Sequence, residues 1–310
     1  MGLIQNEGGQ CSQSRTARQA QNAAGQGRIS IPSSHRAAGG DARNGSDRYF
    51  ASCYTSRAFR PTGPMTASKS VDFRARLLAR YLSTHHSVSG ARDGLARRRP
   101  YLERLVGAHF PAARDSAILD LGCGHGAIVW AARNLGYTNV TGVDASPEQV
   151  AAAGELGISG IRHGDLRGSL AEAAPASLDA IVLYDLFHYF EKDEQMAIAD
   201  AVHRALKPGG CFILHLPNAE AIFAARMRYW DMLANDAFTR ASIAQLLRAC
   251  DFARVECFED KPVAHGLKSG IRAALWPGVR ALMRLILAIE TGESGREAIF
   301  SQCLLAVATK

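Results

Sequence analysis

The stretch Ile118-Leu119-Asp120-Leu121-Gly122-Cys123-Gly124-His125-Gly126 decides the fold of this 310-residue chain. An apolar run that ends in a carboxylate predicts a buried parallel strand. Glycines at alternate positions predict a tight turn where the backbone approaches a ligand. Residues 127–132 are typical of a helix start, whose free N–H groups would face the same ligand. The stretch therefore predicts a strand, a loop and a helix around a nucleotide.

The turn by itself fits two kinds of nucleotide. Gly122, Gly124 and Ala127 satisfy the pattern G-x-G-x-x-G/A, which is typical of dinucleotide sites. Asp120, however, lies in the strand end just before the turn, where its charge would repel a pyrophosphate and suit a cationic amino acid or a sulfonium. Asp144 follows the next apolar strand, at the right distance to accept hydrogen bonds from both ribose hydroxyls.

The motifs that follow resemble those of class I S-adenosylmethionine-dependent methyltransferases, in the same order along residues 117–216. They are a ribose-binding strand end (144–149), an adenine loop (164–166), a fourth strand beside the transferred methyl (178–185) and a Lys-Pro-Gly-Gly turn before a fifth strand (206–215). The resemblance implies S-adenosylmethionine as cofactor. It implies cofactor contacts from Asp120, Gly122, Cys123, Gly124, Asp144, Ala145, Asp165, Leu166 and Tyr184.

Transfer of a methyl group to a hydroxyl benefits from a general base. Candidates must follow strands at their carboxyl ends, where ligands of doubly wound sheets bind. We expect His188 to be the best placed base and His215, at the end of the fifth strand, the second. Asp185 could orient a histidine or bind a sugar hydroxyl. The alternative for His188 is a packed, hydrogen-bonded histidine of the core.

Strands alternate with helical stretches through the second half of the chain. The pattern predicts a Rossmann-like, doubly wound α/β sheet with strands at 117–121, 139–143, 159–162, 178–184, 210–216, 254–258 and 302–308. The resemblance implies a seven-stranded, mostly parallel methyltransferase sheet whose last strand is antiparallel. We expect this domain to span 116–310, with a helical insertion at about 260–300.

The first 115 residues have a different character. Residues 1–64 are rich in Gly, Ser, Gln, Ala and Arg without apolar periodicity, which predicts a disordered tail. Met65 begins a sequence typical of a natural start, so the tail is either real or a mis-assigned extension. Helical spacing at 71–82 and 101–106 predicts a helical cap over residues 65–115, above the cofactor site.

The net charge of +7 is not a nucleic-acid signal, because eight arginines and three acidic residues in 1–64 account for +5 of it. The rest of the chain carries little charge and no nucleic-acid-binding module. Seven cysteines show no metal-ligand spacing, and their odd number argues against a full disulfide framework. We therefore expect no metal and a cytoplasmic enzyme.

Residues 217–250 and 262–292 resemble methyltransferases of bacterial polysaccharide and lipopolysaccharide biosynthesis. Those relatives carry Thr-His-Glu where this chain has Leu233-Ala234-Asn235, so the histidine is missing near Ala234. Residues 282–289 are apolar on almost all sides. The wider segment is interrupted by Arg272, Pro277, Arg280 and Arg284, too often for a membrane span. We expect 271–290 to pack on the sheet or on a partner in a homodimer. The alternative is peripheral contact with the inner membrane surface.

These observations predict an S-adenosylmethionine-dependent methyltransferase that methylates an oxygen of a sugar or glycan intermediate. A small metabolite with an O, N or C acceptor is the first alternative. An NAD-dependent sugar oxidoreductase would need a Tyr-x-x-x-Lys pair, and none occurs beyond the fourth strand. A cofactor-binding pseudo-enzyme is the remaining alternative, and its support is the missing histidine.

Overall fold

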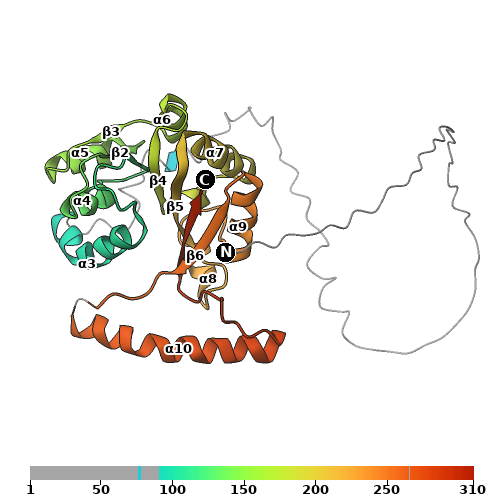
Figure 1. The fold of residues 1–310 in the computed structure, drawn as a ribbon. Coiled ribbons are helices and arrows are strands. Elements are labelled where there is room, and N and C mark those ends of the chain that lie inside the picture. The colour runs from blue at the N-terminus through green and yellow to red at the C-terminus, as the bar shows by residue number, and fades with distance from the viewer. Residues whose placement is uncertain (1–75, 78–90, 265) are drawn as a thin grey trace, which may run out of the picture. The chain divides into compact units, whose positions relative to one another are not determined.

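Seven strands form one sheet in the part of the chain that the computed structural model describes, which is residues 76–77, 91–264 and 266–310 (Figure 1). They are β1 (Ile118–Leu121), β2 (Val140–Asp144), β3 (Ile161–His163), β4 (Leu178–Tyr184), β5 (Leu206–Pro217), β6 (Arg254–Glu259) and β7 (Cys303–Thr309). The predicted tail at 1–64 lies outside the described residues. So does the predicted helix at 71–82, apart from Arg76 and Leu77.

The strand order is β3-β2-β1-β4-β5-β7-β6. β3, β2, β1, β4 and β5 pair in parallel, and β7 is antiparallel to both β5 and β6. The predicted doubly wound sheet with an antiparallel last strand is therefore confirmed. The carboxyl ends of β1 to β6 all lie at the same edge of the sheet, and this edge collects the candidate site residues.

Helices cover both faces of the sheet (Figure 1). One face packs against α3 (Ala91–His109), α4 (Ala127–Asn134) and α5 (Pro147–Glu155); the other packs against α6 (Leu166–Glu172), α7 (Lys192–Ala205) and α9 (Arg240–Ala249). In β4, Ala180 and Val182 face the first group, whereas Ile181 and Leu183 face the second. Burial on both faces explains why this strand is a continuous apolar run rather than an alternating one.

Two local predictions need correction. The predicted helix at 101–106 is part of a longer helix, because α3 runs from Ala91 to His109 and contains Pro100. The predicted turn at 206–210 is part of β5 and forms a bulge in its pairing: Leu206 pairs with Leu178, and the next pair is Cys211 with Ala180. Gly209 supplies the positive φ (76°) that this bulge needs.

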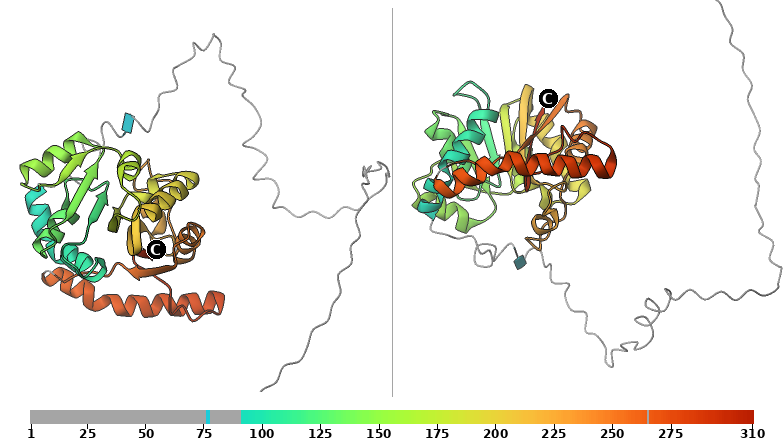
Figure 2. Two further views of the ribbon diagram at one scale, coloured as in Figure 1. Left: turned by 45° about the horizontal axis from the view of Figure 1, so that its top comes forward. Right: turned by 90° about the horizontal axis from the view of Figure 1, so that it is seen from below.

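The segment after β6 forms the long helix α10 (Leu267–Thr291), drawn as a single rod in Figure 2. We expected this segment to pack on the sheet or on a homodimer partner, and the sheet does not bury it, because Ser269 is the one buried residue of α10. Packing on a homodimer partner stays a prediction. Among the described residues, none covers the apolar side of α10, whose large apolar side chains are exposed. No helix among the described residues is long and apolar enough to cross a membrane.

Candidate active site

The glycine turn after β1 is tied to the end of β2 by backbone hydrogen bonds. The amides of Gly122 and Cys123 donate to the carbonyl of Val143 over 2.8 and 3.1 Å. The amide of Gly124 donates to Oδ2 of Asp144 over 2.7 Å. Gly122 and Gly124 have φ values of 70° and 55°, a region that side chains other than glycine rarely adopt. The glycines therefore hold the loop in the shape of a ligand cradle.

Asp120 is buried beneath this cradle without a partner. It is 1% exposed, and neither of its carboxylate oxygens has a hydrogen-bond partner among the described residues. Burial raises the pKa of Asp120 to about 8, and the nearby charge of Asp144 adds to the rise. A buried carboxylate of this kind needs a compensating cation. The ammonium group of S-adenosylmethionine fits this need, whereas the pyrophosphate of a dinucleotide would worsen the repulsion.

Asp144 occupies the end of β2, where its two oxygens organise the surrounding loops. Oδ1 accepts a hydrogen bond from the amide of Ser146 over 2.8 Å, and Oδ2 accepts the bond from Gly124. Each oxygen keeps a second lone pair, so the carboxylate could also accept two hydroxyl groups of a ribose. Ala145 follows in the same loop, and its carbonyl lies 3.1 Å from Nε2 of His163.

Asp165 and Leu166 lie where β3 leads into α6. Asp165 caps this helix, and its Oδ1 accepts hydrogen bonds from the amides of Arg167 (2.7 Å) and Gly168 (3.2 Å). Leu166 is buried in the core. Both residues stand at the same sheet edge as Asp120 and Asp144, one strand further out.

The other half of the edge holds a histidine between two carboxylates. Nδ1 of His215, in β5, lies 2.5 Å from Oδ1 of Asp185, at the end of β4. Nε2 lies 3.5 Å from Oδ2 of Asp260, just after β6, without hydrogen-bond geometry. Burial alone would lower the pKa of His215, but its acidic neighbours, Tyr184 and the two carboxylates, raise it well above the ordinary value.

The backbone of Asp185 is held in an unusual conformation by this arrangement. Its φ is 57°, and its amide donates to the carbonyl of His215 over 3.2 Å. Desolvation opposes ionisation of Asp185, but the charge of His215 and its hydrogen bond lower the pKa of the carboxyl. Strained non-glycine residues of this kind cluster at functional sites.

Aromatic rings complete the surroundings of His215. Tyr184 stacks on the imidazole, with ring centroids 4.3 Å apart and planes inclined by 5°. The hydroxyl of Tyr184 lies 3.2 Å from that of Tyr101, in α3, and the guanidinium of Arg98 lies 5.9 Å from the centre of the Tyr184 ring. Desolvation raises the pKa of Tyr184. The cap helix α3 therefore reaches this half of the site.

His188 has a different environment from His215. It lies in the single-turn helix η1 (Phe187–Tyr189), is 6% exposed, and has no partner for Nδ1 among the described residues. Burial lowers its pKa to about 4, although Asp185 and Asp231 oppose the shift. The structure thus places Asp185 in hydrogen-bond contact with His215 rather than with His188.

The segment with the missing histidine packs beneath η1. The amide of Asn235 donates to the carbonyl of His188 over 2.9 Å, and its side-chain amide donates to the carbonyl of Tyr189 over 2.9 Å. Ala234 is buried. In this chain the segment therefore supports η1 through Asn235.

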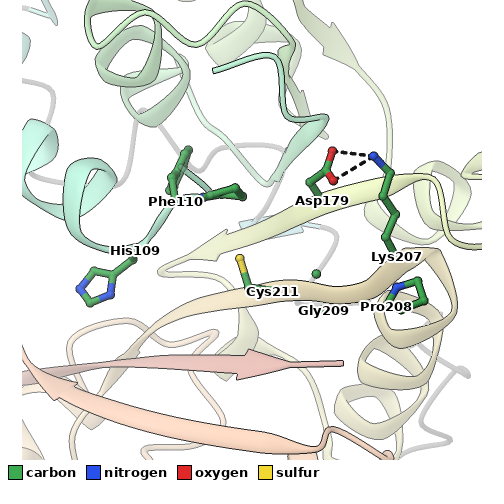
Figure 3. A pocket seen from close by; sticks show the side chains of 9 residues that line it. His109, Phe110, Asp179, Lys207, Pro208, Gly209 and Cys211 are labelled. Carbon is green, nitrogen blue, oxygen red and sulfur yellow. Dashed lines mark hydrogen bonds and ion pairs between the residues drawn. The ribbon is translucent and has the colours of Figure 1, made fainter. Parts of the chain in front are cut away.

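The described residues line two cavities, one at each edge of the sheet. One of about 240 Å³ is lined by His109, Phe110, Pro111, Asp179, Lys207, Pro208, Gly209, Gly210 and Cys211 (Figure 3). It lies at the amino ends of β4 and β5, so it is at the opposite edge from Asp120 and His215. A second cavity of about 220 Å³ adjoins the site itself, where Tyr101, Arg104, Phe258, Asp260 and Lys261 contribute to its walls.

Sequence reasoning missed Asp260 and Tyr101. Asp260 follows the predicted strand at 254–258, just as Asp144 follows the predicted strand at 139–143. The expectation that ligands bind at the carboxyl ends of strands could therefore have found it. Nothing in the sequence around Tyr101 indicates that α3 brings its hydroxyl to Tyr184, 83 residues away.

Comparisons with known proteins agree with this geometry. Residues 118–210 match the family model described as a methyltransferase domain. The O-methyltransferase resE of Aspergillus sclerotiorum is 30% identical over 134 residues, which are 39% of this chain and 50% of that protein. The chain therefore matches about half the length of this curated relative.

Solved structures show the same fold. A SAM-dependent methyltransferase from Archaeoglobus fulgidus aligns with a TM-score of 0.52 at 14% identity, over 77% of this chain and 99% of that one. The putative methyltransferase of Haloferax volcanii, solved with the Trm112 methyltransferase activator, aligns with a TM-score of 0.50 at 19% identity, over 70% and 91% of the two chains. The chain therefore has the fold of these solved methyltransferases, and its residues 118–210 match a methyltransferase domain.

Proposed function

We propose that this chain is an S-adenosylmethionine-dependent O-methyltransferase in which His215 is the general base. The observation that carries the proposal is the placement of His215 between Asp185 and Asp260 at the ligand-binding edge of the sheet. The similarity to an O-methyltransferase over 134 residues supports an oxygen acceptor.

The cofactor half of the site supports binding of S-adenosylmethionine. When bound, this cofactor supplies an activated methyl group. Asp120 provides the buried negative charge that its ammonium group needs, and Asp144 provides acceptors for the ribose hydroxyls. The glycines keep side chains out of the loop between them. We propose adenine contacts for Asp165 and Leu166 and a flank of the cofactor for Tyr184.

The acceptor half of the site supports proton removal. Asp185 accepts the Nδ1 hydrogen of His215, which fixes the ring and leaves Nε2 to take the proton of an acceptor hydroxyl. Asp260, 3.5 Å from Nε2, stabilises the imidazolium that results. Because these carboxylates raise the pKa of His215, the neutral, active form of the base becomes more abundant as the pH rises.

We propose a hydroxyl of a sugar or glycan intermediate as the acceptor. The support is the sequence resemblance at 217–250 and 262–292 together with the carboxylates of Asp185 and Asp260, which suit polar hydroxyl groups. A small metabolite with a single hydroxyl is the second candidate, favoured by the aromatic walls that Tyr101 and Phe258 contribute beside Asp260.

Two measurements test this function. Calorimetric titration with S-adenosylhomocysteine and, separately, with NAD should show binding of the first alone; NAD binding alone would contradict the proposal. Incubation with methyl-labelled S-adenosylmethionine and separate panels of nucleotide sugars, glycan extracts and phenols then identifies the acceptor. Labelling of phenols with sugars untouched would replace the sugar proposal by the small-metabolite one.

A further inference from the structure

Helix α10 exposes a long apolar stripe. Eight of its large apolar residues are between 38% and 82% exposed: Leu267, Ile271, Leu275, Val279, Leu282, Leu285, Ile286 and Ile289. The opposite side of the helix contacts the chain, where Arg280 pairs with the buried carboxylate of Glu259 over 2.8 Å. The apolar stripe thus faces away from the domain that carries it, along a helix about 37 Å long.

The spacing of the stripe is that of a helix–helix seam. Ile271, Leu275, Gly278, Leu282, Leu285 and Ile289 follow one another at intervals of 4, 3, 4, 3 and 4 residues. This is the heptad pattern with which two helices interlock their side chains. Alanines 274, 281 and 288 recur every seventh residue beside it, and a Cβ on Gly278 would meet nothing within 4 Å. Small residues at these positions allow two helices to approach closely.

We propose that the occupant of this stripe is the same stripe of a second copy of this chain, packed antiparallel. When the two helices are centred on residue 280, Ile271 of one copy faces Ile289 of the other, Leu275 faces Leu285 and Gly278 faces Leu282. Two-fold symmetry repeats these three pairs on the other side of the centre. Every seam residue then has a partner. The symmetry axis passes between the two copies of residues 279–281.

The charges along the stripe select the antiparallel arrangement. Lys268 and Arg272 lie in the first turns of α10, and Glu290 lies in its last turn, all of them exposed. Antiparallel packing brings Arg272 of one copy toward Glu290 of the other, whereas parallel packing sets like charges side by side. An anionic lipid surface fits less well, because Glu290 would face its phosphates and a lipid makes no use of the regularly spaced alanines.

The interface also connects to the site. Glu259, which Arg280 holds from the inner side of α10, directly precedes Asp260. Pairing of two α10 helices therefore steadies the segment that carries one of the two carboxylates around His215.

The test measures the mass of the full chain in solution by light scattering and sedimentation equilibrium. We expect a dimer for the native chain and a monomer for Leu282→Glu combined with Leu285→Glu. The matched control is Met232→Glu, which changes an 83% exposed residue outside α10 and should leave the dimer intact. Far-ultraviolet circular dichroism of each variant shows that it folds, so this test does not depend on that of the proposed function.

Charge exchange tests the orientation. Arg272→Glu or Glu290→Arg alone should raise the dissociation constant of the dimer by about tenfold, and the two together should restore it. Val279→Cys, near the axis, should form a disulfide between copies, whereas Leu267→Cys, at the helix end, should not. A native chain that stays monomeric, or a dimer that survives the Leu282 and Leu285 changes, would overturn the proposal. So would a monomer that sediments with phosphatidylglycerol vesicles but not with phosphatidylcholine vesicles.

Discussion

The two halves of the ligand-binding edge are built in opposite ways. In the β1–β2 half, the turn after Asp120 and the strand end at Asp144 lie within 25 residues of each other, and their contacts are made by loop backbone. In the β4–β6 half, Asp185, His215 and Asp260 come from three strands and are separated by 30 and 45 residues. The first half is a local motif that suits a fixed cofactor. The second depends on strand order, which leaves it free to vary with the acceptor.

The largest predicted effect concerns the two histidines of the β4–β6 half. We expect His215→Ala to lower kcat by about 10²–10⁴-fold, because the acceptor hydroxyl loses its base. His188→Ala should lower kcat by less than about tenfold, because a buried, neutral ring without a carboxylate partner is a poorer base. Turnover is measured with the acceptor that the labelling screen identifies, and S-adenosylhomocysteine affinity shows whether each variant folds. Equal losses in the two variants would contradict the assignment.

The cofactor half should respond in affinity rather than in turnover. We expect Asp144→Ala to weaken S-adenosylhomocysteine binding by about 100-fold, since two charge-assisted hydrogen bonds are lost. Calorimetric titration measures this. Glu148→Ala removes a nearby exposed carboxylate and serves as the control, with affinity close to that of the native chain. An Asp144 variant that binds as tightly as the control would remove the ribose assignment.

We expect the buried charge of Asp120 to lower the free energy of unfolding, although the same charge favours cofactor binding. Its folded pKa, about 8, is above the ordinary value, so its contribution to stability is complete at low pH and is lost as the pH rises toward 8. We expect the native chain to lose roughly 2–4 kcal/mol more than Asp120→Asn between pH 5 and pH 8. Urea unfolding of both proteins at the two pH values measures the difference. The same change should weaken S-adenosylhomocysteine binding, and parallel unfolding curves at both pH values would disprove the buried charge.

The smallest effect sharpens the description of the acceptor half. Asp260 helps to raise the pKa of His215, so Asp260→Asn should lower that pKa. The rise of kcat/KM with pH should then move toward acid, because the base is neutral at lower pH. Glu256→Gln, on the exposed part of β6, is the control and should leave the profile unchanged. A change in KM alone, with the same pH profile, would assign Asp260 to acceptor binding instead.

Most of the fold could be predicted from the sequence. The seven strands lie within a few residues of their predicted positions, since central parallel strands are unmistakable apolar runs and their helices begin at clear caps such as Ser146 and Thr239. The predicted helix at 101–106 was too short, because proline usually ends a helix and α3 continues through Pro100. For α10 the sequence left two possibilities, the sheet or a homodimer partner, because an apolar pattern predicts which side of a helix is buried but not what buries it.

The sequence by itself determined the local structure of the β1–β2 half, for which we propose cofactor binding. Asp120, the glycine turn and Asp144 could be identified from their order and spacing in the sequence, because a strand, a turn and a helix are local structures. Only the tertiary structure decided which histidine has carboxylate partners, that Asp260 and Tyr101 belong beside it, and that the apolar side of α10 stays exposed. Those facts depend on contacts between residues far apart in the chain, which strand order and packing fix and sequence spacing does not.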